Sequence, residues 1–487
     1  MTKKVKRVAG LIIKNRKALI NDHFITSTGI GKPSVFHALV IIYLEFFAWG
    51  LLTMPVMSNL MRLFPNRIFL MNGIIMGVKG FLSFLSAPLI GALSDIWGRK
   101  FFLLITVFFT CLPIPLLALN GCWFFVLTSI SGVCAVTFSV IFAYVADITK
   151  EEERSSAYGI VSATFAASFV ISPALGAHLL ENYSENFVVA LATAIAAFDV
   201  LFILVAVPES LPEKFSANYH KTTQFSWEQA DPFSSLRKIG IHKTVLLICI
   251  TVLFSFIPEA GMYSCLFVYI RYVIGYSMET VVIYIAALGV MAVVFQSCMG
   301  ALMKMFGAKR TVLLGLFCEA LHLLWFSFST YDWMVWMAGF LASFATITYP
   351  AISSYVSVHS DGDKQGLIQG IVMGVRSLCN GIGPALFGII FYLCDVDLYY
   401  NQKLPSAEDV SLNGTSNDVT VTNYNFIRGP PFLFGSLLTI VALLLASFIP
   451  ENNSRFSTTV NSANLPVNVK NEAWSDKKKD ASSPVHL

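Results

Sequence analysis

The apolar positions of this chain come in long runs separated by shorter polar segments. A hydrocarbon core of about 30 Å is crossed by a helix of about 20 apolar residues. Backbone groups in lipid must find their hydrogen bonds within the segment, so each run is expected to be helical. The pattern predicts twelve membrane-spanning helices, at residues 35–57, 71–93, 101–119, 122–146, 156–180, 187–208, 243–270, 279–303, 311–329, 333–356, 366–394 and 430–449.

The composition agrees with this pattern, and the positions of the basic residues predict how the chain is oriented in the membrane. The 487 residues are 56% hydrophobic and 13% charged, against about 25% charged in soluble chains. Lys and Arg concentrate in residues 1–34, in 209–243, after 450 and in the short loops on that same side. The other side has few basic residues: Arg62, Arg67, Arg271, Lys403 and Arg428. The positive-inside rule then predicts cytoplasmic termini in a plasma membrane or endomembrane protein.

The basic N-terminus has no long apolar stretch before the first predicted helix, so we expect no signal peptide. Basic residues beside a first span usually set topology, which we favour over a nucleic-acid or anionic-lipid patch. The nine Cys lie in or beside predicted spans without metal-ligand spacing, so we interpret them as small core residues. No phosphate-binding Gly-x4-Gly-Lys motif or catalytic constellation is present. We therefore expect no enzyme, no metal and no cofactor.

Polar segments divide the chain into a basic N-terminal segment (1–34), a six-helix half (35–208), a central loop (209–242), a second six-helix half (243–449) and a polar tail (450–487). The tail is expected to be disordered. A long loop at 395–428 is predicted on the outer side and carries Asn413-Gly414-Thr415, a glycosylation acceptor. We expect a glycoprotein modified at Asn413.

The two halves share an internal repeat. The run Gly91-Ala92-Leu93-Ser94-Asp95-Ile96-Trp97-Gly98-Arg99-Lys100 returns in weaker form at Gly300-Ala301-Leu302-Met303-Lys304-Met305-Phe306-Gly307-Ala308-Lys309-Arg310. The halves also end alike, in Val207-Pro208-Glu209-Ser210 and Ile449-Pro450-Glu451-Asn452. Such homologous halves are typical of transporters.

The first copy of the run lies on the predicted cytoplasmic turn between spans two and three. Gly91 and Gly98 permit a tight turn and close helix approach. Asp95 is placed to meet a helix N-terminus or basic groups across the boundary between the halves. Arg99 and Lys100 are expected to anchor at lipid headgroups.

This run resembles the signature loop of the major facilitator superfamily, although Ile96 stands where that family often has a basic residue. The resemblance covers all twelve spans. It implies an all-α membrane fold of two pseudo-symmetric six-helix bundles that move about a central site by alternating access. In that fold the five residues Gly91, Asp95, Gly98, Arg99 and Lys100 would belong to the cytoplasmic gate.

Further stretches are similar to one branch, the hippocampus-abundant-transcript (major facilitator domain-containing 14) proteins. They are Phe142-Ala143-Tyr144-Val145-Ala146-Asp147-Ile148-Thr149, Val207-Pro208-Glu209-Ser210-Leu211-Pro212-Glu213-Lys214, Ser226-Trp227-Glu228-Gln229-Ala230-Asp231-Pro232-Phe233 and Gly429-Pro430-Pro431-Phe432-Leu433-Phe434-Gly435.

The fifth span partly matches the Gly-x8-Gly-x3-Gly-Pro-x2-Gly-Gly pattern of drug/proton antiporters. The corresponding positions are Gly159, Ser168, Ser172, Pro173, Gly176 and Ala177. Small residues there also serve helix packing, the interpretation we favour. The fourth span lacks the Arg of many proton-coupled members, which argues against their standard proton relay.

Charged residues inside spans cost about 2.5–3.5 kcal/mol to insert and usually face a cavity or a partner. Glu45, in the first span, is predicted to line a cavity; the alternative is a salt bridge to Lys79, which is equally a candidate solute contact. Glu259 follows Pro258, where a kinked helix suits a proton or cation, with a kink hydrogen bond as the alternative. Arg376, near Asn380, would hold an anionic group or neutralise Glu259.

Other polar residues within spans have weaker grounds. Asp199 is expected to be buried and satisfied by hydrogen bonds. Glu319 and His322 are expected to form a local pair, with a proton relay as the second interpretation. Gln296 and Gln369 are candidates for hydrogen bonds to a solute. Aromatic residues that would stack on a solute or simply pack are Trp49, Tyr144, Tyr263 and Tyr349.

The sequence thus predicts a monomeric secondary transporter, a symporter or antiporter, for a small polar organic solute. Protonation of Glu45 or Glu259 is the candidate coupling step. The Pro-Glu-Ser and Pro-Glu-Asn ends resemble sugar porters and favour a sugar-like solute. Two alternatives stay open: a drug/proton antiporter, and a non-transporting receptor or trafficking scaffold on the same fold.

Overall fold

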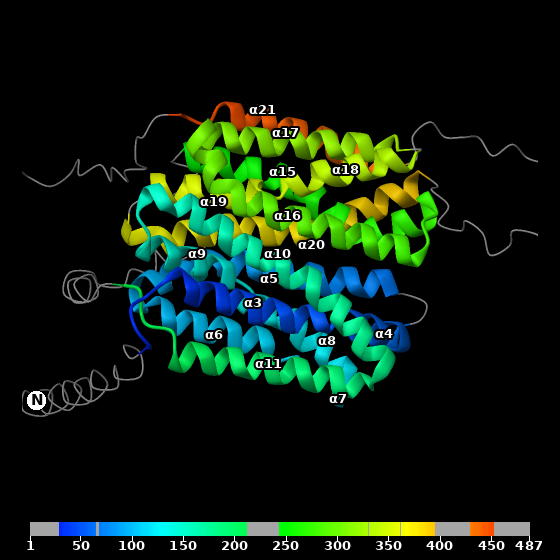
Figure 1. Ribbon diagram of the computed structural model, residues 1–487, viewed down its shortest axis with the longest axis horizontal. Coiled ribbons are helices and arrows are strands. Elements are labelled where there is room, and N and C mark those ends of the chain that lie inside the picture. The colour runs from blue at the N-terminus through cyan, green and yellow to red at the C-terminus, as the bar shows by residue number, and fades with distance from the viewer. Residues whose placement is uncertain are drawn as a thin grey trace, which may run out of the picture.

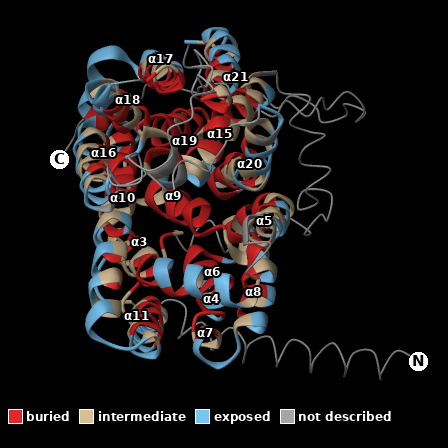
Figure 2. Ribbon diagram, turned by 90° about the vertical axis from the view of Figure 1, so that its right-hand side faces the viewer, coloured by how far each residue is buried: buried red, intermediate tan, exposed pale blue. Residues whose placement is uncertain are grey.

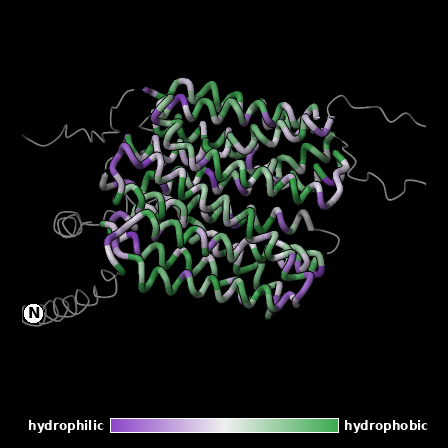
Figure 3. The backbone as a smooth tube through the Cα atoms, viewed as in Figure 1, coloured by the Kyte–Doolittle hydropathy of each residue, from purple (hydrophilic) through white to green (hydrophobic). Residues whose placement is uncertain are grey.

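The computed structural model describes residues 29–64, 68–211, 243–329, 331–360, 362–394 and 429–451. Within these ranges the chain forms helices and no strand. Twelve stretches are long and apolar enough to cross a membrane, as predicted. Figure 3 shows apolar residues along the helices and hydrophilic ones gathered toward their two ends, as expected for a bundle in a bilayer.

The helices form two bundles that lie one above the other in Figure 1 and are seen end-on in Figure 2. The N-terminal bundle contains α3 (Val35–Leu51), α4 (Thr53–Leu63), α5 (Ile68–Trp97), α6 (Arg99–Cys111), α7 (Leu116–Leu119), α8 (Gly121–Ile130), the 3-10 turn η1 (Ser131–Cys134), α9 (Thr137–Ile148), α10 (Glu151–Asn182) and α11 (Glu185–Val205). The C-terminal bundle contains α15 (Lys243–Val268), the π-helical turn η2 (Tyr269–Ile274), α16 (Met278–Phe306), α17 (Ala308–Ser327), α18 (Asp332–Ala345), α19 (Thr348–His359), the 3-10 turn η3 (Gly362–Lys364), α20 (Gln365–Leu393) and α21 (Pro430–Ser447).

Several spans depart from the predicted single helices. The first is two helices, α3 and α4, because Pro55 has no N–H to continue the α3 hydrogen bonds. The fifth begins at Glu151, earlier than predicted, since three Glu in its first turn favour a helix N-terminus beyond the apolar stretch. Helices therefore extend past the hydrocarbon-length segments that hydropathy detects.

The bundles meet along two helix pairs, α5 with α20 and α10 with α16. These pairs join span two to span eleven and span five to span eight, so they are equivalent under the internal repeat. Close approach requires small residues. A Cβ on Gly91 would lie 2.1 Å from the carbonyl oxygen of Gly366, and one on Gly159 would lie 2.4 Å from that of Gln296.

The repeat is also visible in paired hydrogen bonds. Tyr144 in α9 donates its hydroxyl proton to the carbonyl of Pro208 at 3.2 Å, and Tyr355 in α19 donates to that of Pro450 at 2.7 Å. Gly98 and Gly307 both adopt positive φ, at 104° and 85°, before α6 and α17. The sequence echoes therefore mark equivalent positions in the two bundles.

Candidate functional site

The N-terminal bundle borders a cavity of about 520 Å³, called here the N-side cavity. Its wall includes Glu45, Trp49, Asn72 and Lys79, all on the first two spans. Glu45, Trp49 and Lys79, which we expected to face a cavity, therefore do line one. The wall is otherwise mainly apolar and includes residues of α20.

Glu45 is held from one side only. Its Oε1 accepts hydrogen bonds from the hydroxyls of Thr110 and Thr137, at 3.0 and 3.1 Å, whereas the buried Oε2 has no partner in the described part of the chain. The two described side chains of Glu45 and Lys79 form no ion pair. Lys79 Nζ instead lies 4.9 Å from the ring centroid of Trp49. The alternative of an interhelical salt bridge is therefore wrong, and Oε2 is free to take a proton.

The C-terminal bundle borders a second cavity, of about 540 Å³, called here the C-side cavity. Glu259, Gln296, His322, Arg376 and Asn380 lie on its wall. The two cavities share Phe138, Phe169 and Asn380, so they adjoin between the bundles. Of the predicted solute contacts, all but Gln369 and Tyr144 line one cavity or the other.

Arg376 is stacked between aromatic rings. Its guanidinium carbon lies 4.1 Å from the centroid of Tyr349 and 5.1 Å from that of Phe256. Arg376 forms no ion pair with any acid in the described part of the chain, and its buried Nε has no hydrogen-bond partner. It therefore does not pair directly with Glu259, although the two groups interact electrostatically.

Two predictions about buried polar residues are wrong. Asp199 is fully buried, but neither carboxylate oxygen has a hydrogen-bond partner among the described residues. Glu319 and His322 form no hydrogen bond with each other in the described part of the chain, and the buried Glu319 Oε1 has no partner there. Sequence spacing placed them on one face but could not orient them.

Two predicted solute contacts serve the protein itself. Gln369 lines neither cavity and donates through Nε2 to the carbonyl of Ser353 at 3.0 Å and to the hydroxyl of Tyr158 at 3.4 Å. Tyr144, fully buried, donates to Pro208. By contrast, Tyr263 and Tyr349 do line the C-side cavity. The cysteine interpretation also needs correction, since Cys122, Cys298 and Cys394 are exposed.

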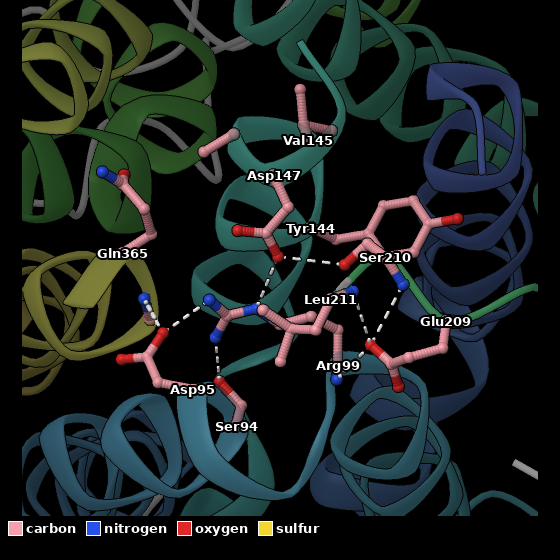
Figure 4. Close-up of polar contacts among 12 residues, drawn as sticks. Ser94, Asp95, Arg99, Tyr144, Val145, Asp147, Glu209, Ser210, Leu211 and Gln365 are labelled. Carbon is pink, nitrogen blue, oxygen red and sulfur yellow. Dashed lines mark hydrogen bonds and ion pairs between the residues drawn. The ribbon is translucent and has the colours of Figure 1, made fainter. Parts of the chain in front are cut away.

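At one end of the helices, Asp95, Arg99, Asp147 and Glu209 form a polar cluster, called here the Asp95 cluster (Figure 4). Asp95 accepts hydrogen bonds from the first backbone N–H groups of α20, Gly366 at 2.7 Å and Leu367 at 2.8 Å. These donors have no partner within their own helix, and the helix dipole favours a negative charge there. Asp95 thereby ties α5 to α20 across the two bundles.

Arg99 lies at the centre of the Asp95 cluster and is fully buried. It forms ion pairs with Asp95 and, through Nε at 2.9 Å, with Asp147, and donates to Ser94 at 2.6 Å (Figure 4). Lys100 is also buried, so the expected anchoring of Arg99 and Lys100 at lipid headgroups is wrong. A buried guanidinium needs close partners, and two carboxylates supply them.

Glu209 and Asp147 were not singled out as site residues from the sequence. Glu209 accepts hydrogen bonds from the backbone N–H groups of Arg99 at 2.8 Å and Lys100 at 3.1 Å, the start of α6. Asp147 also accepts from Ser210 Oγ at 2.9 Å. For Glu209 the available signal was the repeated Pro-Glu ending of each half, which the sequence analysis took as evidence for the repeat, the family branch and a sugar-like solute.

A second set of contacts crosses between the bundles at the same end. Arg154 at the start of α10 donates to the carbonyl of Ser357 in α19 at 3.1 Å. Tyr158 donates to the hydroxyl of Ser357 at 3.2 Å. Both cavities instead lie from the middle of the helices toward the opposite end, as Asn72, Tyr284 and Phe326 on their walls indicate. Hydrogen bonds therefore join the two bundles at one end of the molecule, and the two cavities lie toward the other end.

The fifth-span positions compared with antiporters are packing positions. A Cβ on Gly176 would lie 2.6 Å from the carbonyl oxygen of Leu51, and one on Gly50 would meet the hydroxyl of Ser172. No group of three or more His, Cys, Asp or Glu that could hold a metal occurs among the described residues. The candidate chemistry is thus that of isolated charges on a cavity wall.

Comparison with known proteins agrees with this architecture. The sequence profile of the Major Facilitator Superfamily matches residues 69–384. The chain is 54% identical over 455 residues to the Hippocampus abundant transcript 1 protein of Mus musculus, covering 93% of this chain and 92% of that protein.

Two solved structures share the fold. The human organic anion transporter MFSD10 (TETRAN) matches with a TM-score of 0.69 at 19% identity, covering 85% of this chain and 98% of that chain. The E. coli fucose:proton symporter FucP matches with a TM-score of 0.62 at 14% identity, covering 86% and 98%. Fold, helix arrangement and sequence agree: the chain belongs to the major facilitator superfamily, a family of transporters, and within it to the hippocampus-abundant-transcript branch.

Proposed function

We propose that this protein is a secondary active transporter that carries a small polar organic solute across a membrane by alternating access. One observation carries the proposal. The Asp95 cluster and the Arg154 contacts join the bundles at one end, while two adjoining cavities occupy the other half. Alternating access requires an asymmetry of this kind, reversed in a second state.

The distribution of basic residues supports the orientation. The positive-inside rule assigns the Asp95 cluster to the cytoplasmic side. The described structure is then the outward-facing state, in which hydrogen bonds join the two bundles on the cytoplasmic side. The hydrogen bonds of the Asp95 cluster cross from α5 to α20, so the transport cycle must break them before the cytoplasmic side can open.

Glu45 is the candidate for coupling transport to protons. Its Oε2 is buried and unpartnered, so protonation removes an unfavourable charge without breaking the hydrogen bonds to Oε1. Intramembrane carboxyl groups commonly serve as proton sites in transporters. The Pro-Glu ending, in contrast, supports no conclusion about sugars, because Glu209 binds the N-terminus of α6 rather than a solute.

The test is uptake by purified protein in proteoliposomes, with pooled labelled sugars, organic cations, organic anions and amphipathic drugs, with and without an inward proton gradient. We expect one pool to be taken up and the gradient to accelerate uptake. Glu45→Gln should fold, since the amide oxygen still accepts from both threonines, but should lose the response to the gradient. Glu181→Gln, at an exposed acid, is the matched control.

Opposite results separate the alternatives. A drug/proton exchanger would be slowed by an inward gradient. Absence of uptake for every pool, from folded and inserted protein, would contradict transport and favour the receptor or scaffold. Unchanged gradient dependence in Glu45→Gln would contradict the role of Glu45 alone.

A further inference from the structure

We propose that the C-side cavity binds the carboxylate of an amphipathic organic anion at Arg376, and that Glu259 takes up a proton when the anion binds. This inference rests on the proposed transport function: it names the substrate class and adds a second proton site, Glu259 in the C-side cavity, to that of Glu45 in the N-side cavity. It is carried by the stacked guanidinium, which forms no ion pair with an acid in the described part of the chain, by the nearby Glu259 and by the composition of the wall.

The geometry of Arg376 leaves its polar edge for a ligand. Tyr349 and Phe256 cover the faces of the guanidinium at 4.1 and 5.1 Å, and Tyr349 also forms a side-chain hydrogen bond to it, so polar contact with a ligand falls to the remaining donors at its rim. The Nε at this rim is buried and has no hydrogen-bond partner among the residues that the structure describes. A carboxylate matches two parallel donors of a guanidinium, which a hydroxyl or an ammonium group does not.

The rest of the wall fits the apolar body of such an anion. Aromatic side chains from both bundles, Phe165, Phe169, Phe256 and Tyr263, line the C-side cavity. Its volume of about 540 Å³ lies within the range of pockets that hold small organic ligands. Asn380, on the wall of both cavities, is positioned to hydrogen-bond to a polar group beyond the carboxylate.

Glu259 competes with the anion for Arg376. It lies on the same wall and interacts electrostatically with Arg376, although no ion pair joins these two described residues. A bound carboxylate places a second negative charge beside the same guanidinium. Protonation of Glu259 removes that repulsion, so proton and anion each raise the affinity for the other.

The groups around Glu259 also favour a proton in this cluster. Glu319 of α17 interacts electrostatically with Glu259, is 3% exposed, and has an unpartnered Oε1. The other titratable groups facing this region are Tyr263 of α15, His322 of α17, Tyr349 of α19, and Cys379 with Arg376 of α20. Arg376 is the one permanent cation among them, and two carboxylates with an added anion would outnumber it.

The experiment measures equilibrium binding of radiolabelled 2-naphthoate to the full-length protein in nanodiscs between about pH 5.5 and 8, where the probe stays ionised. Lower pH protonates Glu259 and frees Arg376, so we expect the affinity to rise by up to about tenfold per pH unit. Glu259→Gln should bind tightly with no pH dependence. Arg376→Gln should lose about 10- to 150-fold in affinity, and Arg376→Lys should recover only part of it.

Controls separate charge at the site from charge elsewhere. Arg310→Gln and Glu181→Gln alter exposed residues away from the cavity and should bind like the parent protein. The neutral analogue 2-naphthamide should bind weakly to the parent protein and be insensitive to Arg376→Gln. Thermal unfolding of each variant shows that the loss of binding is not a loss of folding.

Several outcomes would overturn the inference: no binding of 2-naphthoate, equal binding of 2-naphthamide, full affinity in Arg376→Gln, or the same pH dependence in Glu259→Gln. Failure of the proposed function gives a different result. Solute uptake without 2-naphthoate binding would support the transport function and contradict the anion site. Binding with the expected pH dependence, but no uptake of any pool, would support the anion site and contradict the transport function.

Discussion

The carboxylate of Asp95 accepts a hydrogen bond of 2.7 Å from the backbone N–H of Gly366, although the two residues lie in different bundles and are 271 positions apart in sequence. The same carboxylate is paired with the buried Arg99. One side chain therefore neutralises a buried cation and caps the N-terminus of α20. Its equivalent in the repeat is Lys304, and the facing helix α10 carries three Glu in its first turn, so the two junctions differ in charge pattern.

Replacing Asp95 by Asn should weaken the junction between α5 and α20. The amide accepts fewer and weaker hydrogen bonds than a carboxylate and leaves Arg99 with one acid in place of two. Spin labels at Trp97→Cys and Gly362→Cys, both exposed positions, report the separation of the two helices at this end. We expect a second population at longer distance, and a distance distribution identical to that of the parent protein would contradict this role of Asp95.

Gly91→Ala should destabilise the same contact between α5 and α20, because the added methyl group has no room. Its new Cβ would lie 2.1 Å from the carbonyl oxygen of Gly366, and neither backbone can move without shifting a helix. Overpacking of this kind costs about 1–3 kcal/mol. Gly77→Ala, on the same helix with nothing within 4 Å, is the matched control. Thermal unfolding should show a lower midpoint for Gly91→Ala alone; equal midpoints would indicate that the helices separate at no cost.

Asp199→Leu should stabilise the protein. The native side chain is fully buried on α11, and neither carboxylate oxygen has a partner, which costs about 1–3 kcal/mol for an unsatisfied polar group. A leucine of similar size removes that cost. We expect a higher unfolding midpoint with solute uptake retained. A lower midpoint would show that the carboxyl is needed for stability, and a loss of uptake in folded protein would show that it takes part in transport.

Asn413 remains a prediction, because it lies outside the described residues. If the loop at 395–428 faces the lumen or the cell exterior, an endoglycosidase should increase the electrophoretic mobility of protein from a eukaryotic host, and Asn413→Gln should abolish the shift. The sequence Asn452-Asn453-Ser454, predicted on the opposite side, serves as the topological control. A shift that persists in Asn413→Gln and disappears in Asn452→Gln would reverse the assigned orientation.

Much of the candidate site was present in the sequence. Intramembrane charge is rare enough that Glu45, Lys79, Glu259 and Arg376 could be selected directly, and all four line a cavity. Their partners could not be selected. Lys79 lies over Trp49 and Arg376 over Tyr349, and both contacts depend on helix rotation and rotamer rather than on spacing.

The sequence alone determined the twelve spans, the two homologous halves and the family, because insertion into lipid depends on local composition and a repeat is visible along the chain. The tertiary structure decided which side of each helix faces a cavity, a neighbour or lipid. In a bilayer the outer surface of a helix is as apolar as its packed surface, so hydrophobic periodicity does not orient it. For this reason Arg99, expected at the membrane surface, is fully buried. The contact of Asp95 with a helix N-terminus of the other half was predicted, but that this helix is α20 was decided by the tertiary structure.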